Sequence, residues 1–529
     1  MLSPLKYFRG YESLQTRIAL ALFSAVLLIL SFPAFNLYLL EWVAFVPLFI
    51  AIRNQTFRQT YLLATLTGTV AVFGGFYWVG IWAEGVMEIP FPANHLFTLG
   101  YAFYCAQAYG IIFSIFGKYQ YSGKLINLFI FPTILTAIWS LFPLEFIYQL
   151  GDGQTYFLPA IQGVDLTGVF GLNWMIAFVN FALFDLIFLS NRQKRLWRAV
   201  VILTPIVCWF AYGWFSLLHW DSKIEQWSFR KIGIVQPNRP ATISRPEPEQ
   251  GYSRLYPLEI EMTQQLAEDG AELVIWPEGN FFGYSFWVNV RAAFQKEIAK
   301  AGVPIIFPDT TVEYTKGDKI FHNSSLWLNN KGKLEDQYHK IQLVPFGEYT
   351  PIVNNFPFLE SLLGEFLSHL TPGKVQKTFQ TTGMRLVPIL CYESLFPQFV
   401  AESIGKDSLG KVILVQSQDG WYGKSNQPEQ HLTSSVLRAV ENRVPLIHVI
   451  NNGPSAIALP NGRYVFYSTP FTRGEWIAEM PYYAKSGGSF YSSHPSLFIN
   501  LIRFMAVLII LSHWNLFIKI GLLQKKPSK

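Results

Sequence analysis

The segment LVPILCYES, residues 386–394, places a cysteine and a glutamate directly after a short apolar run. A run of this length, rich in branched residues, is typical of a buried strand. Similar runs recur through the second half of the chain, and helical patterns separate several of them. The predicted strands are 231–235, 272–275, 303–307, 324–328, 386–390, 412–415 and 446–450, and the predicted helices are 258–267, 288–300 and 428–442. This alternation predicts a layered α/β domain.

Three residues capable of chemistry stand at or near the ends of predicted strands: Glu278, Lys340 and Cys391. Sites in α/β sheets form at the carboxyl ends of strands. A carboxylate can deprotonate a cysteine, and a lysine can stabilise the oxyanion that forms when a thiolate attacks an acyl carbon. Taken singly, such a cysteine is usually a buried filler, such a glutamate a turn residue and such a lysine a solvated one. The combination predicts acyl chemistry.

The first 219 residues differ, because their long apolar stretches contain very few charges. The whole chain is 51% hydrophobic and 14% charged, whereas about 25% charged is usual. This composition excludes a disordered chain and disfavours a wholly soluble one. A membrane span needs about 20 apolar residues, and Pro33 divides the first block into two spans. The predicted spans are 18–31, 37–52, 61–83, 93–117, 125–144, 166–184 and 199–218, with an eighth at 498–518.

Positive residues collect in alternate loops. The basic segments are 6–17, 53–58, 118–124, 192–198 and 519–529, whereas 32–36, 84–92 and 145–165 contain no Lys or Arg. Cytoplasmic loops hold such positive charge, so the segment 220–495 is predicted to lie outside the cytoplasm. The net charge of +6 therefore comes mostly from basic residues that set the membrane topology, and we expect no nucleic-acid partner. The long N-terminal apolar run, with no cleavage site after it, predicts an uncleaved anchor.

Three cysteines are too few and too scattered for a disulfide framework or a thiolate zinc site. Cys105 and Cys208 lie within predicted spans, where we expect them to be small apolar fillers. We predict no metal site. Only Cys391 is a candidate for chemistry.

The segments around Glu278, Lys340 and Cys391, in that order, resemble the Glu-Lys-Cys triad of the nitrilase superfamily. With spans on both sides, the chain resembles the apolipoprotein N-acyltransferase family over nearly its full length. The most specific motifs are residues 339–351, Cys391-Tyr392-Glu393, Asp419-Gly420-Trp421-Tyr422-Gly423, Gln430-His431, Arg438-Ala439, Glu441-Asn442-Arg443 and Asn451-Asn452-Gly453. The chain departs from the family pattern outside the triad, at Ser417-Gln418-Asp419 and Phe146-Ile147, and in lacking a Lys-Trp pair shortly after Pro240.

The resemblance implies a role for each matching residue. Cys391 is expected to be the acylated nucleophile, Glu278 the general base and Lys340 the oxyanion stabiliser. Glu348 is expected to position or tune the lysine. The remaining supporting residues of the expected active site are Asn323, Tyr392 and Glu393.

The implied fold is a multi-span helical membrane domain joined to a nitrilase-like αββα sandwich outside the cytoplasm. The expected domains are 1–219, with seven spans, 220–495, which is catalytic, and 496–529, with the eighth span and a basic tail. Two apolar runs near the expected site, 281–287 and 356–367, fit either a lipid contact or a buried core.

The implied reaction moves an acyl chain from a membrane phospholipid, through a cysteine thioester, to the N-terminal amine of diacylglyceryl-cysteine in an apolipoprotein. It needs neither a cofactor nor a metal. We expect a monomer in the bacterial inner membrane, in contact with membrane lipids, with its catalytic domain facing the periplasm. Two alternatives remain open: a membrane-tethered amidase that acts on a small substrate, and a transporter or receptor with an outer domain.

Overall fold

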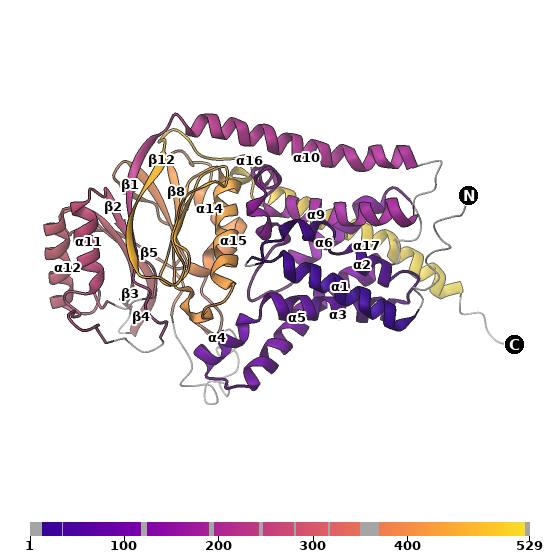
Figure 1. Cartoon of the computed structure of the whole chain (residues 1–529), viewed down its shortest axis with the longest axis horizontal. Helices are drawn as coiled ribbons and strands as arrows, with labels where there is room; N and C mark the ends of the chain where they lie inside the picture. Colours follow the sequence, from indigo (N-terminus) through magenta and orange to yellow (C-terminus); the bar gives the residue numbers. More distant parts are fainter. Residues whose placement is uncertain are drawn as a thin grey trace.

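The computed structural model describes residues 13–33, 35–117, 124–189, 195–242, 247–279, 282–315, 318–349 and 370–523. Within them the chain forms a helical bundle and a two-sheet sandwich that lie end to end (Figure 1). Several predicted features lie outside the described residues. These are the basic residues 6–9, most of 118–124, residues 192–194, the tail after 523, and the apolar run 356–367.

The sandwich contains two six-stranded sheets. The order of the first is β12 (Gly474–Tyr482), β1 (Ser228–Gln236), β2 (Leu273–Ile275), β3 (Ile305–Thr315), β4 (Asp318–Leu328) and β5 (Leu334–His339). The order of the second is β11 (Tyr464–Tyr467), β10 (Ala456–Ala458), β9 (Leu446–Ile450), β8 (Lys411–Ser417), β7 (Met384–Leu390) and β6 (Phe379–Thr381). Strands β1, β2 and β3 are parallel to one another, as are β7, β8 and β9.

Helices cover the outer face of each sheet, which makes the sandwich four layers deep. Helices α11 (Leu258–Glu268) and α12 (Val288–Ala301) pack on the first sheet. Helices α14 (Pro397–Ile404) and α15 (Gln427–Asn442) pack on the second. Buried apolar side chains such as Ile275 and Leu414 fill the space between the sheets. The predicted αββα class is therefore confirmed, and so are the seven predicted strands and three predicted helices.

The bundle is built from apolar helices and short connecting turns. Its elements are α1 (Leu14–Ser31), η2 (Tyr38–Trp42), α2 (Val46–Ala51), α3 (Phe57–Gly75), α4 (Trp78–Met87), α5 (Ala93–Phe116), α6 (Asn127–Trp139), η3 (Leu150–Tyr156), α7 (Leu158–Ile161), α8 (Val164–Thr167), α9 (Val169–Phe184), η4 (Asp185–Leu189), α10 (Arg195–Ile224) and α17 (Leu497–Leu523). The short helix α16 (Phe490–Ser493) precedes α17. Helix α10 runs past residue 219, the predicted end of the first domain.

Among the described residues, four helices are long and apolar enough to cross a membrane, or five if the bent pair α3 and α4 counts as one span. Three further apolar helical stretches are shorter: Tyr38–Ala51, Asn127–Trp139 and the Leu497–Ser512 part of α17. The count of eight spans therefore stays a prediction.

The structure adds two details to the predicted spans. The predicted span 61–83 is bent by 64° between α3 and α4, a pair that together is apolar and long enough for one broken span. The bend follows Gly75, whose carbonyl accepts hydrogen bonds from Gln430 at 2.9 Å and Asn426 at 3.3 Å. In a continuing helix this carbonyl would have accepted a backbone N–H, so side chains of the sandwich replace the helical hydrogen bond. Cys208 is exposed, so it does not fill packed space, whereas Cys105 is buried.

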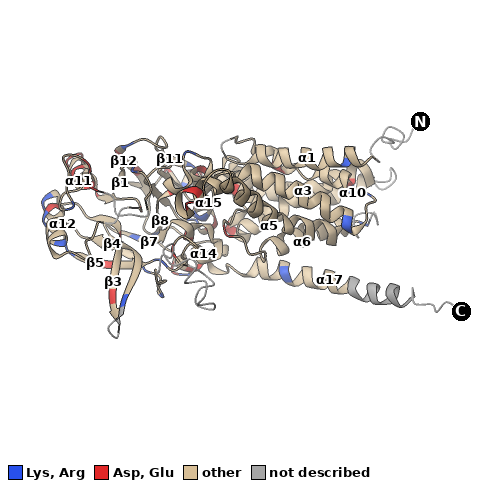
Figure 2. Ribbon diagram, turned by 90° about the horizontal axis from the view of Figure 1, so that it is seen from below, with Lys and Arg blue, Asp and Glu red and all other residues tan. Residues whose placement is uncertain are grey.

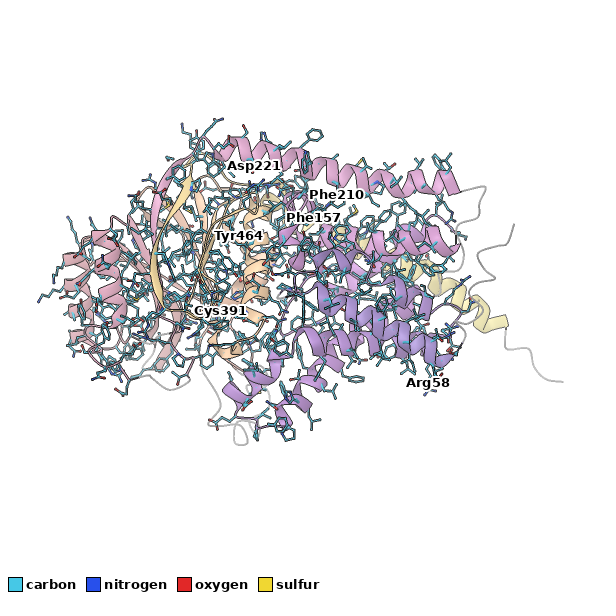
Figure 3. The ribbon with its side chains drawn as sticks, viewed as in Figure 1. Arg58, Phe157, Phe210, Asp221, Cys391 and Tyr464 are labelled. Carbon is cyan, nitrogen blue, oxygen red and sulfur yellow. The ribbon has the colours of Figure 1, made fainter. Side chains whose placement is uncertain are left out.

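Charge is distributed along the long axis of the molecule. The bundle helices are almost wholly free of charged residues in Figure 2, whereas the sandwich carries many. Arg58 lies at the end of the bundle farther from the sandwich, and Cys391 lies in the sandwich (Figure 3). Arg17 donates to the carbonyls of Ala51 and Arg53 at 2.6 and 2.9 Å, which brings three basic residues to that far end.

A buried ion pair joins the bundle to the sandwich. Arg443, at the end of α15, lies 2.8 Å from Asp165 of α8 and donates to the side chain of Gln162 at 2.8 Å. Both ionic side chains are nearly inaccessible, with 2% and 11% of their surface exposed. Removing one partner of such a pair leaves an uncompensated buried charge. The junction therefore depends on Arg443 more than a surface contact would.

We expect Arg443→Met to destabilise the purified protein by about 3–5 kcal/mol, because Asp165 would remain buried without its cation. The measurement is thermal unfolding in detergent. The matched control is Arg463→Met, because Arg463 pairs with Asp221 of α10 across the same junction but is 49% exposed. An exposed pair contributes about 0–1 kcal/mol. Equal losses in the two variants would contradict the assigned role of the buried pair.

Candidate active site

The three residues of the predicted triad converge at one edge of the sandwich. Glu278 follows β2 by three residues, while Lys340 and Cys391 follow β5 and β7 directly. The ammonium nitrogen of Lys340 lies 3.7 Å from Oε1 of Glu278. The charges of Glu278 and Lys340 both act on the Cys391 thiol. A buried acid, a buried cation and a thiol thus share one site.

Asn323 and Glu348 hold the acid and the lysine in place. Asn323, on β4, donates from its amide nitrogen to Oε1 of Glu278 at 2.5 Å and to Oε1 of Glu348 at 2.7 Å. Glu348 contacts the Lys340 ammonium at 2.9 Å and also accepts the backbone N–H of Val344 at 2.8 Å. The lysine therefore lies between two carboxylates that one amide group links together.

Burial and these neighbours set the charges of the site. Burial raises the pKa of Glu278; Lys340 opposes this rise and Glu348 adds to it. Burial alone would lower the pKa of Lys340, but Glu348 and Glu278 outweigh it and raise that pKa. Burial and Glu278 raise the pKa of Cys391, while Lys340 lowers it. The site at rest thus holds a protonated thiol, a charged lysine and a carboxyl group that binds protons more readily than an exposed one.

Glu393 links the lysine segment to the cysteine turn. Its Oε1 accepts hydrogen bonds from the Tyr338 hydroxyl at 2.7 Å and from the backbone N–H groups of Ile341 and Gln342 at 2.7 and 3.0 Å. Its Oε2 accepts the N–H of Leu390 at 2.7 Å. Burial raises the pKa of Glu393 to about 7. The side chain joins the ends of β5 and β7, so it holds Lys340 and Cys391 at a fixed separation.

Tyr392 joins the cysteine turn to the bundle. Its hydroxyl donates to the backbone carbonyl of Glu145 at 2.6 Å. Its ring packs edge-on against Phe396, with centroids 4.9 Å apart. All seven predicted site residues therefore lie in or beside one site.

Sequence reasoning assigned no role to three residues behind the cysteine turn: Ser394, Asp419 and His431. The carbonyl of Cys391 accepts from the Ser394 hydroxyl at 3.1 Å and faces Nε2 of His431 at 3.2 Å. Cys391 itself has a φ of 50°, in the left-handed region that few side chains adopt. The motifs 419–423 and 430–431 were visible in the sequence, but nothing local showed that they contact the cysteine.

Cys391 borders a small cavity of about 30 Å³ between the sandwich and the bundle. Its walls come from both parts, and the bundle contributes Phe76, Trp78, Phe146 and Tyr148. A second cavity, also of about 30 Å³, lies within the bundle and is lined mainly by apolar side chains, Cys105 among them. Phe76, Phe146 and Tyr148 line both cavities. The thiol therefore borders a mainly apolar cavity that shares three wall residues with the cavity inside the bundle.

Two family models match this chain. Residues 231–483 match the carbon-nitrogen hydrolase model, and residues 24–182 match the model of the apolipoprotein N-acyltransferase N-terminal domain. Among solved structures, an amidase from Nesterenkonia sp. is 19% identical, with a TM-score of 0.35, over 48% of this chain and 92% of that chain.

Curated relatives named apolipoprotein N-acyltransferase align with nearly the whole chain. The protein of Geobacter metallireducens is 28% identical over 504 residues, which cover 90% of this chain and 92% of that one. The protein of Chlorobaculum tepidum is 26% identical over 526 residues, covering 90% and 93%. That of Rickettsia typhi is 26% identical over 426 residues, covering 79% and 82%. With its apolar helices and its carbon-nitrogen hydrolase sandwich, the chain is a membrane protein that belongs to the apolipoprotein N-acyltransferase family.

Proposed function

We propose that this enzyme moves an acyl chain from a membrane phospholipid, through a thioester on Cys391, to the N-terminal amine of diacylglyceryl-cysteine in an apolipoprotein, the last step of bacterial lipoprotein maturation. The observation that carries the proposal is the position of the buried Glu278–Lys340–Cys391 cluster beside an apolar cavity walled by bundle helices. The mainly apolar walls that the bundle places beside the nucleophile suit an acyl chain better than a small polar amide. This observation disfavours the tethered amidase, and a transporter has no use for the cluster.

The first half-reaction forms the thioester. Glu278 accepts the thiol proton, and the sulfur attacks the ester carbonyl carbon of the phospholipid. The Lys340 ammonium stabilises the negative charge that develops on the carbonyl oxygen. Collapse of the tetrahedral intermediate breaks the ester C–O bond, and the lysophospholipid oxygen leaves with the proton that Glu278 returns.

The second half-reaction transfers the acyl chain to nitrogen. The neutral amine of the apolipoprotein attacks the thioester carbon, and Glu278 accepts a proton from that nitrogen. Lys340 again stabilises the oxyanion. Collapse breaks the C–S bond, and Glu278 returns the proton to the sulfur, which restores the thiol. The apolar walls limit the access of water, which would otherwise hydrolyse the thioester.

We place the chemistry in residues 220–495 and the membrane attachment in 1–219 and 496–529. Arg58 and the basic residues near it lie at the end of the bundle away from the sandwich. If the basic end is cytoplasmic, the sandwich faces the periplasm of the inner membrane, where exported apolipoproteins and donor lipid meet. A monomer contains all the residues of the proposed site.

Incubation with phospholipid alone should leave the wild-type enzyme stalled as the acyl-enzyme, with one acyl-sized mass added at Cys391. Cys391→Ser should gain no such mass, because Glu278 is not tuned to deprotonate a hydroxyl. Glu278→Gln should stay unacylated, since its amide accepts no proton. Lys340→Met should slow acylation on the order of 10²–10³-fold, the usual cost of losing an oxyanion donor.

The measurement is intact mass against time, with Cys208→Ser as the control that should behave like wild type because it lies on an exposed helix face. Normal acylation of Glu278→Gln would refute the base assignment. Continuous release of free fatty acid by the wild type, without an apolipoprotein, would favour the amidase-type hydrolase instead.

Chain length offers an independent test of the lipid donor. Cys105 is 3% exposed and lines the inner cavity, so Cys105→Phe should shift the bound acyl chains toward shorter ones. Cys208→Phe makes the same change on an exposed face and should leave the distribution unchanged. Mass spectrometry of the acyl-enzyme formed from mixed phospholipids reads both results. Identical distributions of acyl chain length in the two variants would show that the inner cavity does not hold the chain of the phospholipid donor.

Orientation is testable by thiol labelling in a variant that lacks all three native cysteines. Lys333→Cys, in the turn before β5, should react with a membrane-impermeant maleimide on intact spheroplasts. Arg58→Cys should react only after lysis. Both side chains are exposed, but Lys333 adjoins β5 of the sandwich, whereas Arg58 lies at the end of the bundle away from it. The reverse pattern would overturn the periplasmic placement.

A further inference from the structure

A buried histidine and aspartate lie behind the nucleophile. His431 belongs to α15, and Asp419 begins the short helix η8 (Asp419–Tyr422); both are nearly inaccessible. Nδ1 of His431 lies 2.9 Å from Oδ2 of Asp419. Nε2 of the same ring lies 2.8 Å from the Ser394 hydroxyl and 3.2 Å from the Cys391 carbonyl. None of the steps proposed above uses this pair.

The partners of the ring imply that it carries both protons. The Ser394 hydroxyl donates to the Cys391 carbonyl, so its oxygen is left to accept from Nε2. A lone pair on Nε2 would instead face the lone pairs of that carbonyl. Nδ1 faces a carboxylate, which also accepts from the Ser417 hydroxyl at 2.6 Å. Each ring nitrogen therefore faces an acceptor, which describes an imidazolium.

The charges around the ring agree with that state. Burial lowers the pKa of His431, but Asp419 outweighs burial and raises it. Glu278 acts in the same direction. His448, whose ring centroid lies 5.0 Å away on β9, has a pKa lowered by burial and stays neutral.

The ring holds a peptide unit that needs support. Cys391 has a φ of 50°, and residues in sparsely populated backbone regions cost about 1–3 kcal/mol unless their surroundings fix them. In a planar trans peptide the C=O and the N–H point in opposite directions. A donor that fixes the Cys391 carbonyl therefore also fixes the direction of the Tyr392 N–H. In turns that present a nucleophile, the N–H of the following residue is a natural oxyanion donor.

We propose that His431, held by Asp419, is a positioning residue that anchors the Cys391–Tyr392 peptide, so that the Tyr392 N–H points at the developing oxyanion together with Lys340. The inference rests on the proposed function, because it concerns attack of the same thiol on an acyl carbon. His431 acts through the backbone and touches neither the sulfur nor the substrate oxygen.

Two reactions of Cys391 separate this role from an effect on the thiol itself. Acylation by p-nitrophenyl butyrate passes through an oxyanion, so it depends on correctly aimed donors. Alkylation by iodoacetamide is a displacement at a saturated carbon and forms no oxyanion. A misplaced N–H should slow the first reaction and spare the second.

The first test variant is His431→Gln. The second combines His431→Gln with Asp419→Asn, so that neither the imidazolium nor its carboxylate is left buried without a partner. We expect acylation to slow about 10–100-fold in both, a large part of the cost of one oxyanion donor. Alkylation of Cys391 should stay within about threefold of wild type, since the thiol and its base are unchanged. The control is His448→Gln, because His448 is a buried histidine that packs on His431 and whose ring nitrogens make no hydrogen bond to the described residues. Both of its rates should match wild type. The melting temperature of the double variant should stay close to that of the wild type.

Unchanged acylation in both variants would overturn the proposal. Equal losses of acylation and alkylation would also overturn it, because His431 would then act on the thiol or on the fold as a whole. The role of His431 can be tested apart from the proposed function, because p-nitrophenyl butyrate acylates an activated thiol whichever acyl donor the enzyme uses in the cell. A wild-type enzyme that reacts with this ester but not with phospholipid would refute the lipid donor, while the ratio of the two rates would still decide the role of His431.

Discussion

Helix α15 imposes the central constraint on this structure, because it is buried on every side and yet carries polar residues along its length. Buried polar groups must find hydrogen-bond partners. On one side Gln430 donates to the Gly75 carbonyl and accepts from the Trp78 indole. On another side His431 reaches the nucleophile turn, and the apolar face packs on the second sheet through residues such as Val436. The bundle, the sandwich and the site therefore meet on one helix.

The apolar strands and the three candidate residues could be predicted because each has a local signature. Runs such as 412–415 are branched and buried, whereas β5 reads LEDQYH and is recognisable only by its pairing with β4. The bend at Gly75 was not predictable either, since its partners come from about 350 residues later. The same holds for Glu393, whose hydrogen bonds join two distant strands. Local sequence patterns predict secondary-structure elements and reactive side chains. They do not predict contacts between residues that are far apart in the sequence.

The departures from the family pattern lie where substrate is expected rather than in the triad. Phe146 packs edge-on against Trp78, with centroids 4.8 Å apart, and lines both cavities. A Pro-Trp pair there would alter the wall that an acyl chain meets without moving Cys391. Gln418 accepts the N–H of Gly420 at 3.1 Å and helps to form the turn that begins with Asp419. Both changes are therefore expected to affect how substrate fits and not which bonds form.

The ion pair between Arg443 and Asp165 limits how freely the two halves of the chain can be exchanged or separated. A carbon-nitrogen hydrolase domain that works alone needs a soluble outer surface, whereas here the end of α15 presents a guanidinium whose counterion belongs to the other half of the chain. Exchange of one half for a half that lacks the matching residue would leave that charge, or its partner, buried and alone. A sandwich cut from this protein at the boundary between the two halves would expose to water a guanidinium and an apolar surface that the bundle now covers.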